Sequence, residues 1–196
     1  MATATRKTAA AKATRKAPAK KTSRAASTSS SGQDAIALLR ADHKKVSALY
    51  EQYENTRSAA RKKALVATIC LELSVHAQVE EEIFYPAVKA ALKDKELVPE
   101  AQVEHASLKE LIAQVKDKEP DGEMFDAKIK VMSEYTKHHV KEEQNEMFPK
   151  AKASRLDMNE LGARIAARKE ELMADPSLME APPATQDVGM EATSSR

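Results

Sequence analysis

Two segments of the chain carry the same residues at the same spacing. In residues 76–86 a histidine is followed by glutamate four positions later and by proline ten positions later, and residues 139–149 repeat this pattern. On an α-helix, positions i and i+4 lie on one face, about 6 Å apart along the axis. Each segment therefore offers an imidazole nitrogen and a carboxylate from one side of one helix. A metal ion can use that pair, whereas a hydrophobic core has no use for it.

Two further histidines extend the pattern. His43 lies 33 residues before His76, and His105 lies 34 residues before His139. This is a weak internal repeat of the helix-pair kind. The chain therefore divides into two half-units, each with two histidines and one glutamate: His43, His76 and Glu80, then His105, His139 and Glu143.

The spacing of apolar residues predicts the secondary structure. Steps of three and four residues indicate four long amphipathic helices, over about 33–55, 58–90, 99–117 and 123–148. Pro86 is expected to kink or end the second helix and Pro149 to end the fourth, because proline has no amide N–H. Asp157 can cap a short fifth helix over about 158–173.

The four long helices each carry one of these histidines on the apolar face, near mid-length. Short loops make successive helices antiparallel. The sequence therefore predicts an all-α fold, an up-down-up-down four-helix bundle with a short C-terminal fifth helix, in which the four histidines meet at one depth.

Charge and composition predict a domain with two tails. Residues 1–32 hold eight Lys or Arg, no acidic residue and no Leu, Ile, Val, Phe or Tyr, so we expect a disordered basic tail. The remainder has 24 basic and 30 acidic residues. Residues 33–174 are expected to form the helical domain, and 175–196, which include Pro182 and Pro183, a disordered C-terminal tail.

Composition also excludes several classes of protein. The single cysteine, Cys70, cannot build a disulfide framework, a thiolate zinc finger or an iron–sulfur cluster. The sequence has no run of about 18 apolar residues and no apolar segment typical of a secretory signal. We therefore expect a cytoplasmic protein with no membrane span.

The six repeated residues predict a metal site. Four imidazoles and two carboxylates without thiolate suit iron, manganese or zinc. Six side chains are too many for one structural zinc, but two glutamates can bridge two metals and leave two histidines for each. One such histidine alone would more often be a hydrogen-bonded core residue, and one His-Glu pair a surface pair. Their repetition in four successive helices favours metal binding.

The residues around this set have weaker assignments. His138 points about 100° away from His139 on the helix, so we expect it to face solvent or to support a ligand. Glutamates beside the motifs are expected to be solvated or to accept hydrogen bonds from ligands, and tyrosines one or two turns away to pack in the core or, less commonly, to bond a ligand. These residues are Glu72, Glu81, Glu82, Glu104, Glu142 and Glu146, and Tyr50, Tyr53 and Tyr135.

The chain resembles the hemerythrin-like HHE cation-binding domain proteins over about 34–172. The resemblance rests on Asp42-His43, His76-x3-Glu80-Glu81, Phe84-Tyr85-Pro86, Glu104-His105, His139-x3-Glu143 and Phe148-Pro149. It implies a four-helix bundle holding two iron ions. It also implies terminal ligation by His43, His76, His105 and His139 and bridging by Glu80 and Glu143.

Two departures from the oxygen-carrying members are informative. Those proteins have a fifth ligand histidine at the position where this chain has Lys109. Their second bridging carboxylate is an aspartate five residues after its histidine, whereas Glu143 lies four residues after His139. The set looks more like that of iron-centre repair proteins and iron-sensing hemerythrin-like domains. It favours redox reaction, NO binding or iron exchange over reversible O2 carriage.

These observations predict a di-iron protein that handles iron, oxygen or nitric oxide, with O2, NO or peroxide as the ligand at the metal. An alternative is a di-iron oxidase or peroxidase, although no acid–base pair outside the ligand set supports turnover. Another is a nucleic-acid-associated protein that makes weak, non-specific contact through residues 1–32, whose charges suit phosphates.

Overall fold

The computed structural model describes Met1 and residues 34–92 and 95–175. These residues are helical and contain no strand. The two predicted disordered tails fall almost entirely within 2–33 and 176–196, outside the described residues. None of the described helices is both long and apolar enough to cross a membrane.

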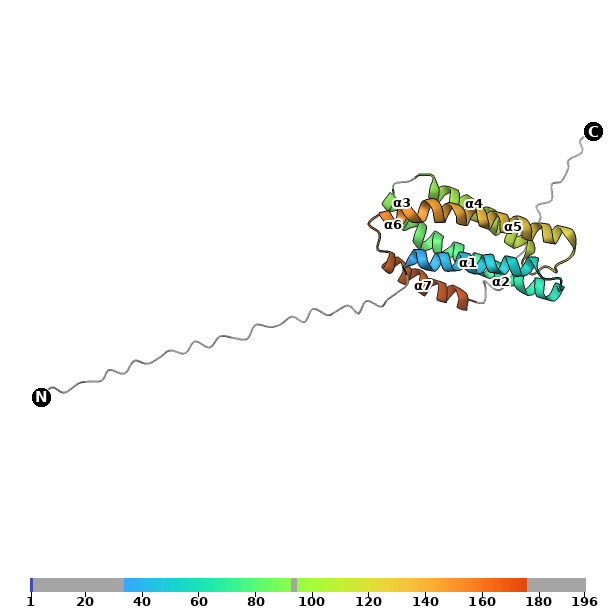
Figure 1. Ribbon diagram of the computed structural model, residues 1–196, viewed down its shortest axis with the longest axis horizontal. Coiled ribbons are helices and arrows are strands. Elements are labelled where there is room, and N and C mark those ends of the chain that lie inside the picture. Colours follow the sequence, from blue (N-terminus) through green and yellow to red (C-terminus); the bar gives the residue numbers. More distant parts are fainter. Residues whose placement is uncertain (2–33, 93–94, 176–196) are drawn as a thin grey trace, which may run out of the picture. The chain divides into compact units, whose positions relative to one another are not determined.

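Four long helices form an up-down-up-down bundle, which confirms the predicted fold. They are α1 (Ala35–Glu54), α2 (Ala59–Val79), α4 (Leu97–Val115) and α5 (Gly122–Glu142). Helix α1 packs against α2 and α5, and α4 packs against the same two helices (Figure 1). All four helices therefore border one shared interior.

Two of these helices continue beyond the expected prolines. Helix α2 runs through a π-helical turn, η1 (Glu80–Phe84), into α3 (Tyr85–Leu92). Helix α5 runs likewise through η2 (Glu143–Met147) into α6 (Phe148–Ala153). The prediction that Pro149 ends its helix is wrong. Pro86 does not end the second helix either, although the regular α-helix is interrupted by η1 just before it.

The widened turns explain how the chain accepts these prolines. The amide of Tyr85 donates a hydrogen bond to the carbonyl of Glu80, five residues earlier. The amide of Phe148 donates in the same way to the carbonyl of Glu143. In an α-helix, a proline ring clashes with the carbonyl four residues earlier. A π-helical turn just before Pro86 and Pro149 gives the ring room, so the helix continues.

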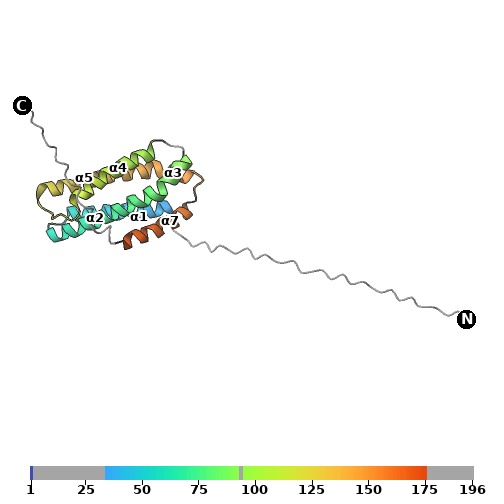
Figure 2. The same ribbon diagram turned by 180° about the vertical axis from the view of Figure 1, so that it is seen from behind.

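The fifth helix, α7 (Met158–Ala174), covers one side of the bundle. The Asp157 carboxylate accepts hydrogen bonds from the amides of Asn159 and Glu160, which confirms the predicted cap. Helix α7 packs on α1, α2 and η1 and lies beside α1 and α2 in both views (Figures 1 and 2). Ile165 is fully buried in this contact, and Arg168 donates to Glu82 at 2.7 Å.

The core consists of two apolar clusters separated by a polar layer. Along α1, Leu39 belongs to one cluster and Val46 to the other, with buried His43 between them. The same order recurs on α4, where His105 lies between Ala101 and Leu108. The polar layer contains all six residues of the repeated motif.

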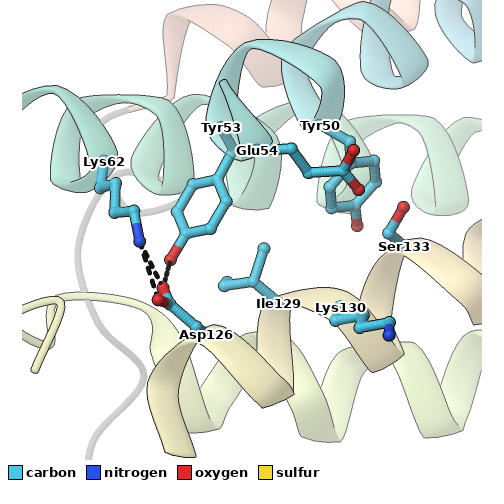
Figure 3. A pocket seen from close by; sticks show the side chains of 8 residues that line it. All are labelled: Tyr50, Tyr53, Glu54, Lys62, Asp126, Ile129, Lys130 and Ser133. Carbon is cyan, nitrogen blue, oxygen red and sulfur yellow. Dashed lines mark hydrogen bonds and ion pairs between the residues drawn. The ribbon is translucent and has the colours of Figure 1, made fainter. Parts of the chain in front are cut away.

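A hydrogen-bond network joins α1, α2 and α5 (Figure 3). Asp126 of α5 accepts from the Tyr53 hydroxyl at 2.6 Å and from Lys62 Nζ at 2.7 Å. These side chains line a cleft of about 420 Å3. Tyr50 and Tyr53 are buried as expected, but Tyr135 is half exposed, so its predicted core position is wrong.

Candidate metal centre

The six residues of the repeat converge in the polar layer of the bundle. All are buried, with at most 6% of each residue's surface exposed. Their ligand atoms form two groups that share Glu80. The first group is His43, His76, Glu80 and Glu143, and the second is Glu80, His105 and His139. The structure therefore brings all six together, while their role as ligands stays a prediction.

The histidines form two close pairs. The Nε2 atoms of His43 and His76 lie 3.0 Å apart, and those of His105 and His139 lie 3.1 Å apart. Metal–ligand bonds of about 2.1 Å, at angles between about 90° and 109°, place neighbouring ligand atoms about 3.0–3.4 Å apart. Both pairs have the spacing of two ligands on one ion.

Each glutamate lies between the two histidine pairs. Glu80 Oε2 is 3.2 Å from His76 Nε2 and 3.5 Å from His105 Nε2. Glu143 Oε2 is 3.2 Å from His43 Nε2 and 3.6 Å from His139 Nε2. A carboxylate that reaches both pairs can bridge two ions.

The buried oxygen atoms support the same assignment. Glu80 Oε1 has no hydrogen-bond partner among the described residues, and Glu143 Oε2 has only the 3.2 Å contact with His43 Nε2 within hydrogen-bond distance. Burial of an ionised carboxylate without a compensating charge costs several kcal/mol, even after the protein relaxes. Two such carboxylates beside four imidazole nitrogens fit a pair of divalent or trivalent cations, and we see no apolar packing reason for them.

Without a cation, the two carboxylates differ in protonation. Burial and the adjacent charge of Glu143 raise the pKa of Glu80 well above its ordinary value. Burial also raises the pKa of Glu143, but the hydrogen bond with His43 and the charge of His139 outweigh it and lower the pKa to about 2. Glu80 therefore holds a proton that a metal would replace.

The histidines are held in different electrostatic settings. Burial, and then the charge of His139, lower the pKa of His105 to about 4, and burial likewise lowers that of His43. For His139, burial lowers the pKa, but Glu104 and Glu143 together raise it overall. His43 and His105 are thus neutral at pH 7, as a metal ligand must be.

The Nδ1 atoms of the four histidines face outer partners, while their Nε2 atoms face one another. His105 Nδ1 is 3.0 Å from Glu81, and His139 Nδ1 is 2.7 Å from Glu104. His43 Nδ1 is 3.1 Å from the Gln144 amide, and His76 Nδ1 is 3.5 Å from Asp42. Such partners orient a ligand histidine and fix which nitrogen carries its proton.

The other acidic residues have separate roles. Glu72, a predicted partner of a ligand histidine, instead accepts from Lys45 at 2.6 Å. Glu82 pairs with Arg168, and Glu142 with His138 at 3.2 Å. The His138 side chain is 64% exposed, which confirms that it faces solvent. The structure assigns no contact with the centre to these four residues.

One residue of the centre was missed by sequence reasoning. The Tyr85 hydroxyl lies 3.0 Å from Glu143 Oε1, 3.3 Å from Glu80 Oε2 and 3.3 Å from His105 Nε2. Burial, and then the charges of Glu80 and Glu143, raise the pKa of Tyr85 well above its ordinary value, so it stays protonated and can donate. The signal was its place in the repeat, nine residues after a ligand histidine.

Phe148 occupies the equivalent position in the second half of the repeat. It stacks on His43 with ring centroids 5.9 Å apart and an interplanar angle of 5°. Tyr85 lies beside His105 with centroids 5.4 Å apart. The two halves therefore share a backbone plan but differ in one hydroxyl group.

A small cavity adjoins the histidines. It has a volume of about 20 Å3, and its lining includes Val46, Leu108 and Val140 as well as the four histidines. One water-sized sphere needs about 10–15 Å3. Lys109, at the position of the fifth histidine of the oxygen carriers, lines this cavity and pairs with Glu81 at 2.7 Å. The space suits a molecule of two or three atoms.

Comparison with known proteins agrees with this geometry. Residues 34–151 match the hemerythrin HHE cation binding domain. The chain belongs to this family, so it is a helical-bundle protein of a class that binds metal cations.

Two relatives are similar to parts of the chain. A hemerythrin HHE cation binding domain-containing protein from Mycobacterium kansasii has the same fold, with a TM-score of 0.62 over 76% of this chain and 99% of that one, at 21% identity. A protein from Nostoc sp. named DNA nickase is 25% identical over 111 residues. That match spans 57% of this chain but 31% of the relative.

Proposed function

We propose that this chain holds a non-haem di-iron centre that reacts with, or senses, a small molecule such as O2, NO or peroxide. The observation that carries the proposal is the pair of histidine groups joined by two buried glutamates. Several metals suit nitrogen and oxygen ligands, and the resemblance to di-iron hemerythrin-like proteins favours iron among them. Iron in this centre would supply redox chemistry and open coordination positions.

The residues around the ligands have different roles in this proposal. Glu81, Glu104 and Gln144 orient histidines through their Nδ1 atoms. Apolar side chains keep bulk water from the cavity, and Tyr85 presents a hydroxyl proton to Glu143. The small cavity supports a ligand no larger than peroxide. Such a protein would act in iron handling or in the response to oxidative or nitrosative stress, in the cytoplasm.

Metal content of the purified, untagged protein tests this proposal. We expect about two irons per chain, and a sharp loss in His76→Ala and in Glu143→Ala because each removes a ligand from a buried group. Glu123→Gln, which alters an exposed glutamate of α5 outside every group of candidate ligands, is the matched control and should keep both irons. Protein that binds no iron after loading, or variants that bind as much as the parent, would contradict the proposal.

Turnover separates this function from its enzyme alternative. A di-iron oxidase or peroxidase would consume peroxide or O2 in many cycles per chain with a supplied reductant. A binding or sensing protein would react once per centre. A stopped-flow and steady-state comparison on the iron-loaded protein distinguishes the two.

A second candidate function is contact with nucleic acid through residues 1–32. Two observations favour it: the eight positive charges without an acidic residue, and the similarity of part of the chain to a relative named DNA nickase. Such contact would be electrostatic and independent of sequence. Nicking itself is not proposed, because we assign no nuclease residues.

Binding of labelled duplex DNA tests this candidate. Affinity should fall steeply between 50 and 200 mM salt, on the order of 10³-fold or more if six or more phosphates are contacted. Deletion of residues 2–32 should abolish it while iron content is unchanged. Equal binding by the deleted protein at low salt would refute the idea.

A further inference from the structure

A second group of potential metal ligands lies on the surface of the bundle. Glu104 of α4 faces His138 and Glu142 of α5, and the ligand atoms of the three lie within 4.8 Å of one another. His138 Nε2 is 3.2 Å from Glu142 Oε1 and 3.4 Å from Glu104 Oε1. His138 and Glu142 are one helical turn apart, so both project from the same face of α5.

Each of the two contacts of His138 has the spacing of two ligands on one ion. Charge-assisted hydrogen bonds between nitrogen and oxygen are about 2.7–2.9 Å long. The two contacts of His138 are longer than this and fall within the separation of about 3.0–3.4 Å that bonds of about 2.1 Å produce. By contrast, Glu104 Oε2 and His139 Nδ1, at 2.7 Å, form an ordinary hydrogen bond.

We propose that Glu104, His138 and Glu142 form a third metal site, which takes a first-row divalent cation at the surface and is linked to the buried centre through Glu104. One imidazole and two carboxylates suit Fe²⁺, Mn²⁺, Co²⁺ or Zn²⁺. The existence of this site does not depend on the di-iron proposal, whereas its link to the centre rests on it.

Glu104 supplies the link because its two oxygens contact different histidines. Oε1 lies beside His138 on the surface, and Oε2 accepts a hydrogen bond from Nδ1 of buried His139. A cation on Oε1 draws electron density from the carboxylate and weakens its hydrogen bond to His139. Because that hydrogen bond raises the basicity of a ligand histidine, occupation of the surface site alters the buried centre.

The surroundings allow a cation to enter and leave. His138 is 64% exposed and lines two clefts, of about 440 and 430 Å3, on the α4–α5 face. A cation held by three protein atoms keeps positions for water and exchanges with solvent. The six residues of the centre are buried, whereas a cation at the surface site would be separated from His139 only by the carboxylate of Glu104.

Counting bound Co²⁺ tests the site. The full chain, first metal-free and then loaded with iron, is dialysed against Co²⁺, beside His138→Gln and Glu142→Gln. We expect the parent to bind one more ion than either variant, or the variants to bind that ion at least about tenfold more weakly, since ligands matter at least as much as their outer partners. Glu123→Gln, an exposed glutamate of the same helix, is the control and should match the parent.

The outcomes separate the two proposals. If the centre binds no iron but the parent still exceeds His138→Gln by one Co²⁺, the di-iron proposal fails and the surface site stands. If the parent and His138→Gln bind Co²⁺ equally in number and affinity, the surface site is refuted. These results do not depend on activity.

The link is tested with Zn²⁺, which has no d–d absorption of its own. Zn²⁺ added to the iron-loaded parent should shift the absorption bands of the iron centre. The shift should persist in Glu123→Gln and vanish in His138→Gln. Zn²⁺ that binds the parent without any shift would overturn the link through Glu104.

Discussion

At the scale of single residues, the Tyr85 hydroxyl brings a hydrogen-bond donor into the centre. It is within 3.3 Å of both glutamates and of His105, and burial keeps it protonated. Phe148 offers no such group to the other half. The two halves of the centre therefore differ in hydrogen bonding.

We predict that Tyr85→Phe keeps both metals but changes the reaction at the centre. The loss of a buried hydrogen bond should lower the free energy of unfolding of the metal-free protein by about 1–2 kcal/mol. The iron-loaded variant should react with peroxide at a different rate. Tyr135→Phe, at an exposed position, is the control in urea unfolding and stopped-flow assays. Unchanged rates in Tyr85→Phe would show that its hydroxyl is structural.

The six converging residues were predictable because their spacing obeys helical geometry. His43 and His105 were found from their place on apolar faces, and Glu80 and Glu143 from the i, i+4 relation. Tyr85 was missed because it lies five residues after Glu80, and in a regular α-helix that step points about 140° away. Only a widened turn stacks it over Glu80.

At the scale of elements, both π-helical turns begin at a glutamate of the centre. Such turns occur mostly as single-turn insertions in α-helices, often at functional sites. The first turn brings Tyr85 into contact with Glu80, the second is followed by Phe148, which stacks on His43, and a proline comes next in both. The helices themselves were predictable from apolar spacing, but proline alone does not tell whether a helix ends or widens.

Helix α7 provides the test at this scale. Ile165 is fully buried against the bundle, so Ile165→Ala should lower the free energy of unfolding by about 2–5 kcal/mol. Arg164→Ala changes an exposed neighbour and should alter it by less than about 0.5 kcal/mol. Urea unfolding followed by circular dichroism measures both. An Ile165→Ala protein as stable as Arg164→Ala would mean that α7 adds little to the fold.

At the scale of the whole molecule, a layer of ionisable groups divides the apolar core. The clusters on either side are joined across four imidazoles and two carboxylates. Such a layer stabilises the fold only when its charges are compensated. The stability of the bundle should therefore depend on metal more strongly than on any one apolar contact.

We predict that metal stabilises the protein more at pH 8 than at pH 5.5. The raised pKa of Glu80 means that the metal-free fold holds a proton that the unfolded chain has lost above about pH 4.5. The stabilisation of the metal-free fold by this proton is lost as pH rises through the pKa of Glu80 in the folded state. Metal takes the place of the proton, so the affinity of the centre for metal increases with pH. Thermal unfolding of loaded and metal-free protein at both pH values gives the difference. A gain in Tm that is equal at the two pH values would contradict this.

The divided core has a consequence for the lifetime of the protein. If the two apolar clusters hold together well only when the layer between them is filled, unfilled chains open more often and reach proteases sooner. The amount of this protein in a cell would then follow the supply of its metal, without any change in the rate at which it is made.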